Sequence, residues 1–411
     1  MRPGGNGPAP PPHPQGNGAH AADHGRAFAG RSGPGRMTSR VAHILNSLGT
    51  GGVPEAVLGL VRHGDTKAHA PLVYCLKPAM EPEAAQDLRR RFEAAGAEVH
   101  VAPGADKIDG VAHLAEWLAG QRIDLLHSHS YRPNLYGRMA GFLIRSNGLR
   151  IVSHYHNQYD DKWLPGSSAL MLERRMAAGT DAMVAVSGMV QKHVAALLDV
   201  PRSRIEVIPN GIAEDKTAPR EREEARRALG LDPSAEVIGC VGRICRQKGQ
   251  DLFVAAALAL LAQGHGGTFA LIGAEEDAVM AARLRASIAA AGMADRVIFL
   301  GHVKDMANVY AALDLLVAPS RWEGFGLMLV EAMAAGCPVI ASEAGAIPEV
   351  AGGAARLVGV EAVEELAEAI GSLDGAARRN MAAVGRLRAA EFGWPRAAAQ
   401  VGELYDRVLR C

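Results

Sequence analysis

Two glutamates flank a glycine-rich loop in the stretch PSRWEGFGLMLVEAMAAGCPVIAS, at residues 319–342. The loop and the expected start of a helix comprise Gly324, Phe325, Gly326 and Leu327. Backbone N–H groups in the first turn of a helix have no partner within the helix, and they attract anions. Glu323, in the loop, is placed to accept hydrogen bonds from sugar hydroxyls, and Glu331, about two turns into the helix, can accept both hydroxyls of a ribose. These residues indicate a nucleotide or sugar site; the alternative is an amphipathic helix with one exposed acid.

Two cations lie on one expected loop-to-helix junction, in the segment GRICRQKGQDL. Arg243 can bind two phosphate oxygens with its planar guanidinium, whereas Lys248 supplies a compact point charge. Together with a helix that starts near Gly249, they predict a diphosphate site. Taken alone, the same pattern also fits two solvated loop cations.

Glycines also follow the first expected strand, in the segment NSLGTGGVPEAVLGLV. Gly51 and Gly52 permit close approach of the backbone to a ligand, and Pro54 suits the first turn of the helix that follows. The spacing is not G-x-G-x-x-G, and no acid follows about 20 residues later, so NAD binding is not expected. A plain turn remains the alternative.

Four histidines form two H-x-H pairs, each at the end of an expected strand. His127 and His129 lie in LLHSHSYRPNLYGRMAG, and His154 and His156 lie in SHYHNQYDDKW. Alternate residues of a strand point to the same face, so each pair shares a face. Because imidazole binds zinc, one hypothesis is a metal site whose bound water makes the chain a hydrolase. The other interpretation is that His127 and His154 point into packing.

From Arg40 onward, short β-rich segments alternate with Ala- and Leu-rich helical segments, which is typical of parallel sheets with crossover helices on both faces. Strands are expected at RVAHIL, PLVYCL, AEVHVA, IDLLHS, LRIVSHY, AMVAVS and IEVIPN, and then at EVIGCVG, TFALIG, RVIFLG, DLLVAPS and PVIAS. In the second half, helices are expected from about Gly249, Ala278, Met306 and Leu327. The predicted fold class is α/β with two Rossmann-like, doubly wound domains, which bind ligands beyond the carboxyl ends of their strands.

The expected N-terminal domain spans residues 38–215, and the expected C-terminal domain spans residues 216–390. Residues 391–411 are expected to form a final helix. The Gly- and Pro-rich residues 1–37 contain no apolar run, and we expect them to be disordered.

Composition narrows the classes of partner. Lys plus Arg (44) equals Asp plus Glu (44), so no overall field favours nucleic acid or anionic lipid. The five cysteines include no C-x-x-C pair, which favours a reducing cytoplasm over a disulfide framework. No apolar run is long enough to span a bilayer, and the N-terminus lacks the apolar core of a signal peptide. We therefore expect a cytoplasmic protein without integral membrane association, and leave its oligomeric state open.

Several segments together resemble the retaining glycosyltransferases of family 4, over nearly all of residues 40–411. They are GRICRQKG, VIFLGHV, VYAALDLLVAPSRWEGFGLMLVEAMAAGCPVIAS, GAIPEVAGG and VIPNGI. The resemblance implies a GT-B fold, in which two Rossmann-like domains face a central cleft. It also implies that residues 216–390 are a nucleotide-sugar-binding domain, which holds a UDP-sugar, and that residues 38–215 are an acceptor-binding domain. The terminal segment EFGWPRAAAQVGELYDRVL resembles the helix that crosses back to the first domain in this fold.

The resemblance also implies roles for individual residues. The expected catalytic residues are His129, Glu323, Arg243 and Lys248. The expected donor-binding residues are Gly51, Gly52, Arg243, Lys248, Gly324, Phe325, Gly326, Leu327 and Glu331. The diphosphate would lie on Arg243 and Lys248, the ribose on Glu331, and the sugar on Glu323 and the amides of residues 325–327. Retention of the anomeric configuration is implied, with the acceptor hydroxyl attacking on the face that the diphosphate leaves. No D-x-D motif precedes a donor strand, so no metal cofactor is expected to be required.

For the acceptor, the polar segment HYHNQYDDKW is expected to border the site. The expected acceptor-binding residues are His156, Asn157, Asp160 and Asp161. Two adjacent carboxylates attract a cation, so the prediction is a small, soluble, hydroxyl-rich acceptor of the aminoglycoside type, with UDP-N-acetylglucosamine as donor; a solvated acidic loop is the alternative. A glycan or exopolysaccharide precursor is the second acceptor candidate. Two other functions stay open: the metal-dependent hydrolase, and a sugar-nucleotide-binding subunit without turnover.

Overall fold

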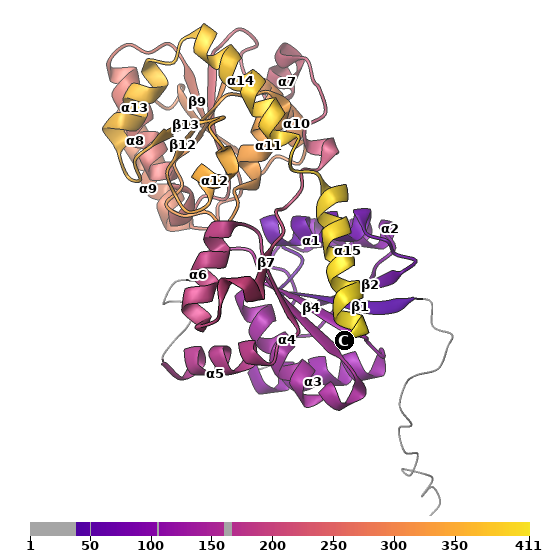
Figure 1. Ribbon diagram of the computed structural model, residues 1–411. Helices are drawn as coiled ribbons and strands as arrows, with labels where there is room; N and C mark the ends of the chain where they lie inside the picture. Colours follow the sequence, from indigo (N-terminus) through magenta and orange to yellow (C-terminus); the bar gives the residue numbers. More distant parts are fainter. Residues whose placement is uncertain (1–37, 50, 105–106, 160–166) are drawn as a thin grey trace, which may run out of the picture. The chain divides into compact units, whose positions relative to one another are not determined.

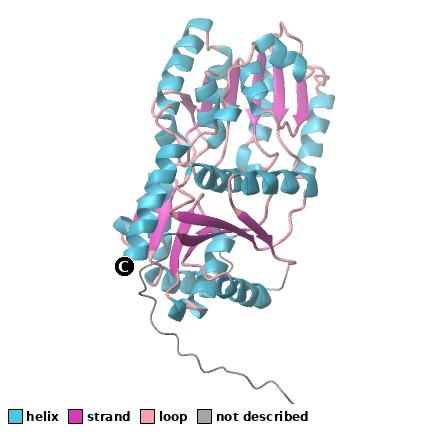
Figure 2. Cartoon of the chain, turned by 90° about the vertical axis from the view of Figure 1, so that its right-hand side faces the viewer, coloured by secondary structure: helices cyan, strands magenta, loops and turns pink. Residues whose placement is uncertain are grey.

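The structure is a computed structural model, and it describes residues 38–49, 51–104, 107–159 and 167–411. The N-terminal segment that we expected to be disordered lies outside these ranges. Within them, strands and helices alternate along the chain, and the strands are parallel to their neighbours (Figure 1). Figure 2 shows helices on both sides of the strands. The α/β class with two Rossmann-like sheets is therefore confirmed.

The first sheet has seven strands in the described part of the chain, in the order β3-β2-β1-β4-β5-β6-β7. The strands are β1 (Ser39–Leu45), β2 (His69–Cys75), β3 (Glu98–Val101), β4 (Leu125–His129), β5 (Arg150–Tyr155), β6 (Ala182–Ala185) and β7 (Ile205–Val207). Their crossover helices are α1 (Gly52–His63), α2 (Pro82–Ala94), α3 (Lys107–Gly120), α4 (Tyr131–Leu143), α5 (Ser167–Ala178) and α6 (Gly188–Leu198). Because β1 and β4 are neighbours in this order, the sheet changes its winding direction between them, and ligands of such sheets bind beside that point.

The second sheet repeats this plan with six strands among the described residues, in the order β10-β9-β8-β11-β12-β13. The strands are β8 (Val237–Val241), β9 (Thr268–Ile272), β10 (Val297–Gly301), β11 (Leu315–Ala318), β12 (Val339–Ser342) and β13 (Arg356–Val358). The helices are α7 (Arg222–Ala228), α8 (Gln250–Ala262), α9 (Ala278–Ala290), α10 (Met306–Ala312), α11 (Leu327–Ala335), α12 (Ile347–Ala351), α13 (Val363–Gly371) and α14 (Gly375–Ala389). Short 3-10 helices occupy Arg145–Asn147, Arg202–Arg204, Glu214–Lys216 and Arg246–Lys248.

The last helix, α15 (Trp394–Arg410), packs on the first sheet although it follows the second in the chain (Figure 1). It contacts α1, and its apolar side chains share one core with strands of the first sheet. The members from the helix are Trp394, Ala397, Val401, Leu404, Tyr405 and Val408. Their recurrence every three to four residues is the period of a helix with one buried face.

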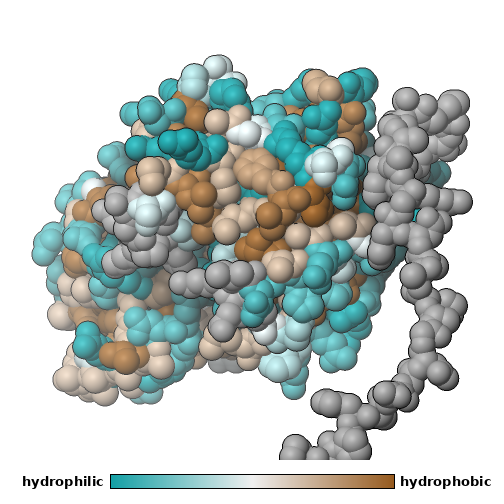
Figure 3. Space-filling model, turned by 90° about the horizontal axis from the view of Figure 1, so that it is seen from below, coloured by the Kyte–Doolittle hydropathy of each residue, from teal (hydrophilic) through white to brown (hydrophobic). Residues whose placement is uncertain are grey.

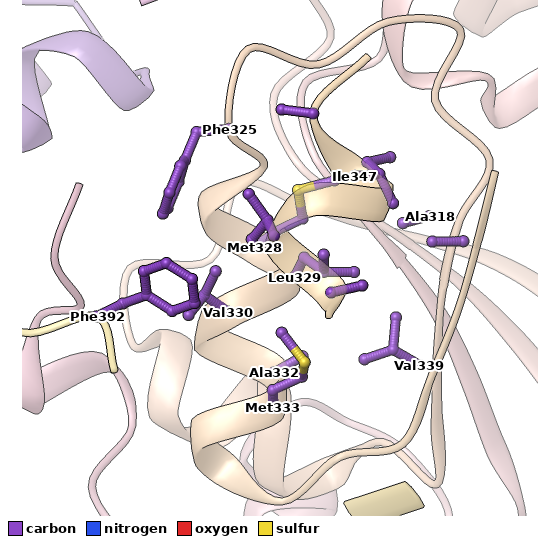
Figure 4. Close-up of a cluster of buried hydrophobic side chains, with 14 of the residues drawn as sticks. Ala318, Phe325, Met328, Leu329, Val330, Ala332, Met333, Val339, Ile347 and Phe392 are labelled. Carbon is purple, nitrogen blue, oxygen red and sulfur yellow. The ribbon is translucent and has the colours of Figure 1, made fainter. Parts of the chain in front are cut away.

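The helix α11 is anchored by its apolar side chains, as Figure 4 shows. Met328 and Leu329 of its first turn are buried, together with residues of β11, β12 and α12. Just before the helix, the ring of Phe325 meets that of Phe392 edge to face, with 5.4 Å between the centroids. This packing holds the N-terminus of α11, and the loop before it, in one position.

All twelve strands expected from the sequence are present, and helices start at or within one residue of Gly249, Ala278, Met306 and Leu327. One feature differs from expectation: the three-residue strand β13 was not predicted. In the charged segment before β8, most residues of helix α7 are exposed, whereas Arg226 is buried and paired with Asp314, with 2.5 Å between Nη2 and Oδ2.

Figure 3 shows one end of the molecule, where apolar side chains form short strips interrupted by hydrophilic residues. Among the residues that the structure describes, no helix is both long and apolar enough to cross a membrane.

All five cysteines are free, and only Cys411 is exposed. Burial raises the pKa of the Cys75, Cys240 and Cys337 thiols to about 12, so these three are inert core residues.

Candidate active site

The structure brings Lys248 and Glu323 into direct contact. The Lys248 ammonium lies 2.5 Å from Glu323 Oε1, and the hydroxyl of Ser320 donates to the same oxygen at 2.9 Å. Only 5 % of Glu323 is exposed, so its charge is held by these two groups rather than by water. A cation assigned to a diphosphate and a carboxylate assigned to a sugar thus lie side by side, at the carboxyl ends of β8 and β11.

Two glycines make this contact possible because a side chain would not fit in their place. Gly249 has φ +68°, and an added Cβ would lie 2.0 Å from the carbonyl oxygen of Pro319. An added Cβ at Gly324 would lie 2.0 Å from the carbonyl oxygen of His156. Contacts this short exclude any larger residue. Gly324 thereby brings the donor loop against the segment that we assigned to the acceptor.

Arg243 lies on the loop after β8, as expected, but its guanidinium pairs with Glu276 instead of facing Glu323. The pair is exposed, with 37 % and 51 % of the two side chains accessible. Exposed pairs contribute little to stability, so Arg243 can exchange Glu276 for another anion at low cost. The backbone of the loop is fixed by Gln250, whose amide donates to the Arg243 carbonyl at 2.8 Å.

Glu331 lies on α11 with both carboxylate oxygens engaged. The hydroxyl of Tyr310 donates to Oε2 at 2.7 Å, and the ammonium of Lys216 lies 3.5 Å from Oε1. Burial, followed by the charge of Glu331, raises the pKa of Tyr310 well above its usual value, so the hydroxyl remains a donor. Burial acts to lower the pKa of Lys216, but Glu331 and Glu55 outweigh it and raise that pKa.

The network continues to α1. Lys216 also lies 3.5 Å from Glu55 Oε2, and Arg91 donates to both oxygens of Glu55 at 2.8 and 3.0 Å. Burial acts to raise the pKa of Glu55, but Arg91 and Lys216 hold it below its usual value. Sequence reasoning missed Tyr310, Lys216 and Glu55. The residues next to them in the sequence do not predict these contacts, because the partners become adjacent only on folding.

The glycine-rich loop before α1 lies next to α11. A Cβ added at Gly52 would lie 3.5 Å from Leu327 Cδ1, so the first residues of the two helices lie close together. At Gly51 an added Cβ would meet no atom within 4 Å. The start of α11, with Gly326 at φ +84° as its N-cap, is therefore bordered by a glycine, Gly52, that carries no side chain.

His129 and His156 form hydrogen bonds within the protein. His129 Nε2 lies 3.1 Å from His43 Nδ1, and His129 Nδ1 lies 3.1 Å from His156 Nε2. Burial lowers the pKa of His43 to about 4 and that of His156 to about 3, and it lowers the pKa of His129 well below its usual value. These imidazoles are therefore neutral near pH 7, and each can donate one hydrogen bond and accept another.

The other expected site residues are placed as follows. His127 and His154 are buried, and His127 Nδ1 lies 2.5 Å from the hydroxyl of Tyr405. The Asn157 side chain accepts a hydrogen bond from the backbone N–H of its neighbour Gln158 at 2.9 Å. Asp160 and Asp161 lie outside the described residues.

A cavity of about 330 Å³ lies beside Phe325 but does not include the ion pair. Its lining includes Asn210, Phe325, Arg388 and Phe392, but neither Lys248 nor Glu331. A cavity of this volume is large enough to be a candidate ligand site. The buried ion pair and the helix N-terminus are the stronger indication, because they combine charges of both signs that the fold holds in place.

Comparison with known proteins agrees with this geometry. The family model described as glycosyl transferases group 1 matches residues 235–374, and the model described as Glycosyltransferase Family 4 matches residues 50–216. Among solved structures, that of HepE from Anabaena in complex with UDP and glucose has a TM-score of 0.78, with 22 % identity, over 90 % of this chain and 100 % of that one.

Curated relatives point the same way. The lipopolysaccharide core biosynthesis mannosyltransferase LpsB of Rhizobium meliloti is 42 % identical over 46 % of this chain and 52 % of its own length. The D-inositol 3-phosphate glycosyltransferase of Segniliparus rotundus is 32 % identical over 70 % of this chain and 67 % of its own. The 2-deoxystreptamine N-acetyl-D-glucosaminyltransferase of Streptomyces fradiae is 31 % identical over 56 % and 57 %. The matches thus span about half to two thirds of each relative. The chain belongs to the group 1 glycosyltransferases and has their GT-B fold.

Proposed function

We propose that this protein is a retaining glycosyltransferase of family 4, which moves a hexosyl or N-acetylhexosaminyl group from a UDP-sugar to an acceptor hydroxyl. The observation that carries the proposal is the contact of Lys248 with Glu323 beside the N-terminus of α11. A donor whose diphosphate meets Lys248 places its sugar against Glu323, because the two side chains are only 2.5 Å apart. HepE, which shares the fold, was crystallised with UDP and glucose, and this supports UDP as the nucleotide.

In this proposal the protein acts chiefly on the leaving group. Negative charge grows on the diphosphate as its bond to the sugar breaks, and fixed donors that meet this charge lower the barrier. Lys248, Arg243 and the first N–H groups of α11 are those donors. The acceptor hydroxyl attacks from the face that the diphosphate leaves, and a phosphate oxygen takes its proton. His129 and the amides of residues 325–327 contact the sugar.

Glu331 is proposed to accept the ribose hydroxyls. Tyr310 and Lys216 hold its carboxylate, and an ionised carboxylate has enough acceptor positions to keep Tyr310 while it receives a ribose hydroxyl. Lys216 has a second carboxylate, that of Glu55, to pair with when ribose approaches. Gly51 and Gly52 leave room for the nucleotide sugar beside α11, because neither glycine carries a side chain.

The donor that we propose is UDP-N-acetylglucosamine, and two acceptor classes have support. The Streptomyces fradiae relative is named for transfer to 2-deoxystreptamine, which agrees with a small aminocyclitol acceptor. The Rhizobium meliloti relative, with higher identity, is named for lipopolysaccharide core synthesis, and this favours a glycan precursor as the second candidate. The proposal of a cationic acceptor depends on the carboxylates of Asp160 and Asp161, whereas the proposal of a glycan acceptor does not.

A panel of donors and acceptors tests the activity. Purified protein is incubated with UDP-N-acetylglucosamine, UDP-glucose, UDP-galactose or GDP-mannose, and with either 2-deoxystreptamine or a truncated lipopolysaccharide core. Release of nucleoside diphosphate is measured, and the anomeric configuration of the product is read by NMR. We expect release that depends on an acceptor, with retention. A product of inverted configuration, or no release from any pair, would contradict the proposal.

Salt and charge distinguish the two acceptor classes. If a cationic acceptor pairs with the acidic segment, the acceptor KM rises with ionic strength and in the Asp160→Asn/Asp161→Asn variant, whereas UDP affinity stays the same. An acceptor KM that responds to neither change would exclude the cationic acceptor and leave the transferase proposal intact.

A further inference from the structure

Five buried histidines gather in the first sheet beside α15. They are His43 on β1, His127 and His129 on β4, His154 on β5, and His156 directly after it. None is more than 8 % exposed. Figure 1 shows β1, β4 and α15 close together, and the His127–Tyr405 hydrogen bond joins the helix to the cluster. The proposed transfer reaction uses only His129 and, for the acceptor, His156, so most of this cluster has no assigned role.

Three of these histidines have the spacing of metal ligands. One ligand nitrogen from each of His43, His127 and His129 lies within 4.8 Å of the others. His43 Nδ1 and His129 Nε2 are 3.1 Å apart. Zinc–nitrogen bonds of about 2.0–2.1 Å in a tetrahedral site separate two ligand nitrogens by roughly 3.3–3.4 Å. A small widening of this pair therefore accommodates a metal ion.

The hydrogen bonds around these three rings support the same assignment. Among the described residues, His127 Nε2 is buried without a partner, whereas His127 Nδ1 is bonded to the Tyr405 hydroxyl at 2.5 Å. His129 Nδ1 is bonded to His156 Nε2. Metal-binding histidines normally use one ring nitrogen for the metal and fix the other by a hydrogen bond. His127 has one nitrogen fixed by a hydrogen bond and one that is buried and without a partner among the described residues.

The cluster offers a second set of three, His129, His154 and His156. In that set neither nitrogen of His154 has a hydrogen-bond partner among the described residues, so no hydrogen bond selects which nitrogen would face a metal. The first set has both the free nitrogen and the second partner that orients it. The structure therefore favours His43, His127 and His129 over the alternative set.

A small cavity borders His43, one member of the first set. Its volume is about 30 Å³, and His43, His69 and Tyr405 are among the residues that line it, whereas His127 and His129 are not. Asp65 and Thr66, at the surface, also belong to the lining. A volume of this size holds about one water molecule. The cavity therefore brings solvent next to His43 and to Tyr405, the partner of His127.

We propose that His43, His127 and His129 form a binding site for a divalent transition metal of the zinc class, with Tyr405 as the residue that orients His127. Imidazole nitrogens suit zinc, copper and nickel, and three of them leave one position for water. The site goes beyond the proposed transfer reaction and is not required for it. A bound ion withdraws His129 from the sugar; this consequence alone rests on the proposed function.

Calorimetry with zinc chloride tests the site in the full chain, purified without a histidine tag. We expect binding of one Zn²⁺ that becomes at least about 100-fold weaker in His127→Gln and about 10-fold weaker in Tyr405→Phe. His154→Gln is the matched control: it removes an equally buried histidine outside the set, and the zinc affinity should not change. Cobalt(II) in place of zinc should give the visible absorption of a tetrahedral site.

Several results would overturn the proposal. They are the absence of zinc binding, equal affinity in His127→Gln and the wild type, and loss of affinity in His154→Gln but not in His127→Gln. Equal affinity in His127→Gln would place the ion on other histidines of the chain. If circular dichroism shows that His127→Gln does not fold, Tyr405→Phe decides, because it keeps the ring in the core and removes only the hydroxyl. An unchanged zinc affinity in Tyr405→Phe would then refute the site.

Discussion

Replacing Lys248 by methionine separates its contribution to stability from its contribution to catalysis. Methionine keeps much of the length and the apolar stem of lysine, but it removes the charge 2.5 Å from Glu323 Oε1. In the wild type, Glu323 Oε1 is bound by the Lys248 ammonium and the Ser320 hydroxyl, and only the hydroxyl would remain in the variant. Water cannot replace the ammonium, because just 6 % of the Glu323 side chain is exposed. The variant therefore leaves a carboxylate charge buried with one neutral donor.

The expected magnitudes follow from this geometry. Removing one partner of a buried ion pair costs about 3–5 kcal/mol, and we expect about 3 kcal/mol because 14 % of the Lys248 side chain still meets water. The double variant Lys248→Met/Glu323→Gln neutralises the stranded carboxylate, so most of this stability should return. Turnover should not return. Loss of one donor to the leaving group raises the barrier by about 3 kcal/mol, or about 100-fold in kcat, in both variants.

Urea unfolding followed by circular dichroism measures the stability, and release of nucleoside diphosphate at saturating donor measures kcat. Arg227→Met is the matched control, because it breaks the exposed pair of Arg227 with Glu223 on α7 and should change stability by less than about 0.5 kcal/mol. A kcat for Lys248→Met within about threefold of the wild type would refute the diphosphate role. If the double variant is as unstable as the single one, the loss of stability does not come from the unpaired Glu323 carboxylate.

Four further predictions concern the other charged groups. Arg243→Ala should lower kcat about 100-fold and leave the unfolding free energy nearly unchanged, since its pair with Glu276 is exposed; normal turnover would exclude it from the diphosphate site. Glu331→Ala should weaken binding of UDP itself, whereas Glu323→Ala should impair only use of the intact donor; calorimetry that finds equal losses of UDP affinity would show that the roles are wrongly divided. EDTA should not abolish transfer, because fixed cations and a helix end meet the diphosphate; activity lost with EDTA and restored by zinc would favour a metal-dependent hydrolase. Folding lowers the pKa of Glu55, so the wild type should be more stable than Glu55→Gln by its full margin at pH values above 4.5, the pKa of an unfolded glutamate. This margin should be lost as the pH falls through the lower pKa of the folded protein. A margin in unfolding free energy that persists in acid would contradict this prediction.

Much of the site could be predicted from the sequence, because its parts are local. The start of α11 at Leu327 follows from a glycine loop and an apolar helix, and the α8 start follows from the Gly249 turn. The strands follow from short β-rich segments bounded by turns. The strand β13 was missed because its residues, Arg356–Val358, lack both the alternation of apolar and polar residues and the Asn-Gly turn just beyond, which mark the equally short edge strand β7.

The partners of each functional group were beyond this reasoning. The sequence around Glu331 does not predict that Tyr310 and Lys216 bind its carboxylate. The sequence around Glu55 does not predict that Glu55 and Glu331 share Lys216. The pairing of Arg243 with Glu276 is equally invisible in the chain.

By itself, the sequence determined the class of fold, the order of the strands and helices, and the residue types at the ends of β8 and β11. Backbone sterics and hydrophobic period act between residues a few positions apart, so they can be read along the chain. Only the tertiary structure decided that Lys248 meets Glu323, that Gly324 meets His156, and that five histidines share one core. Contacts of this kind join residues far apart in the chain, and they depend on how sheets, loops and the final helix pack.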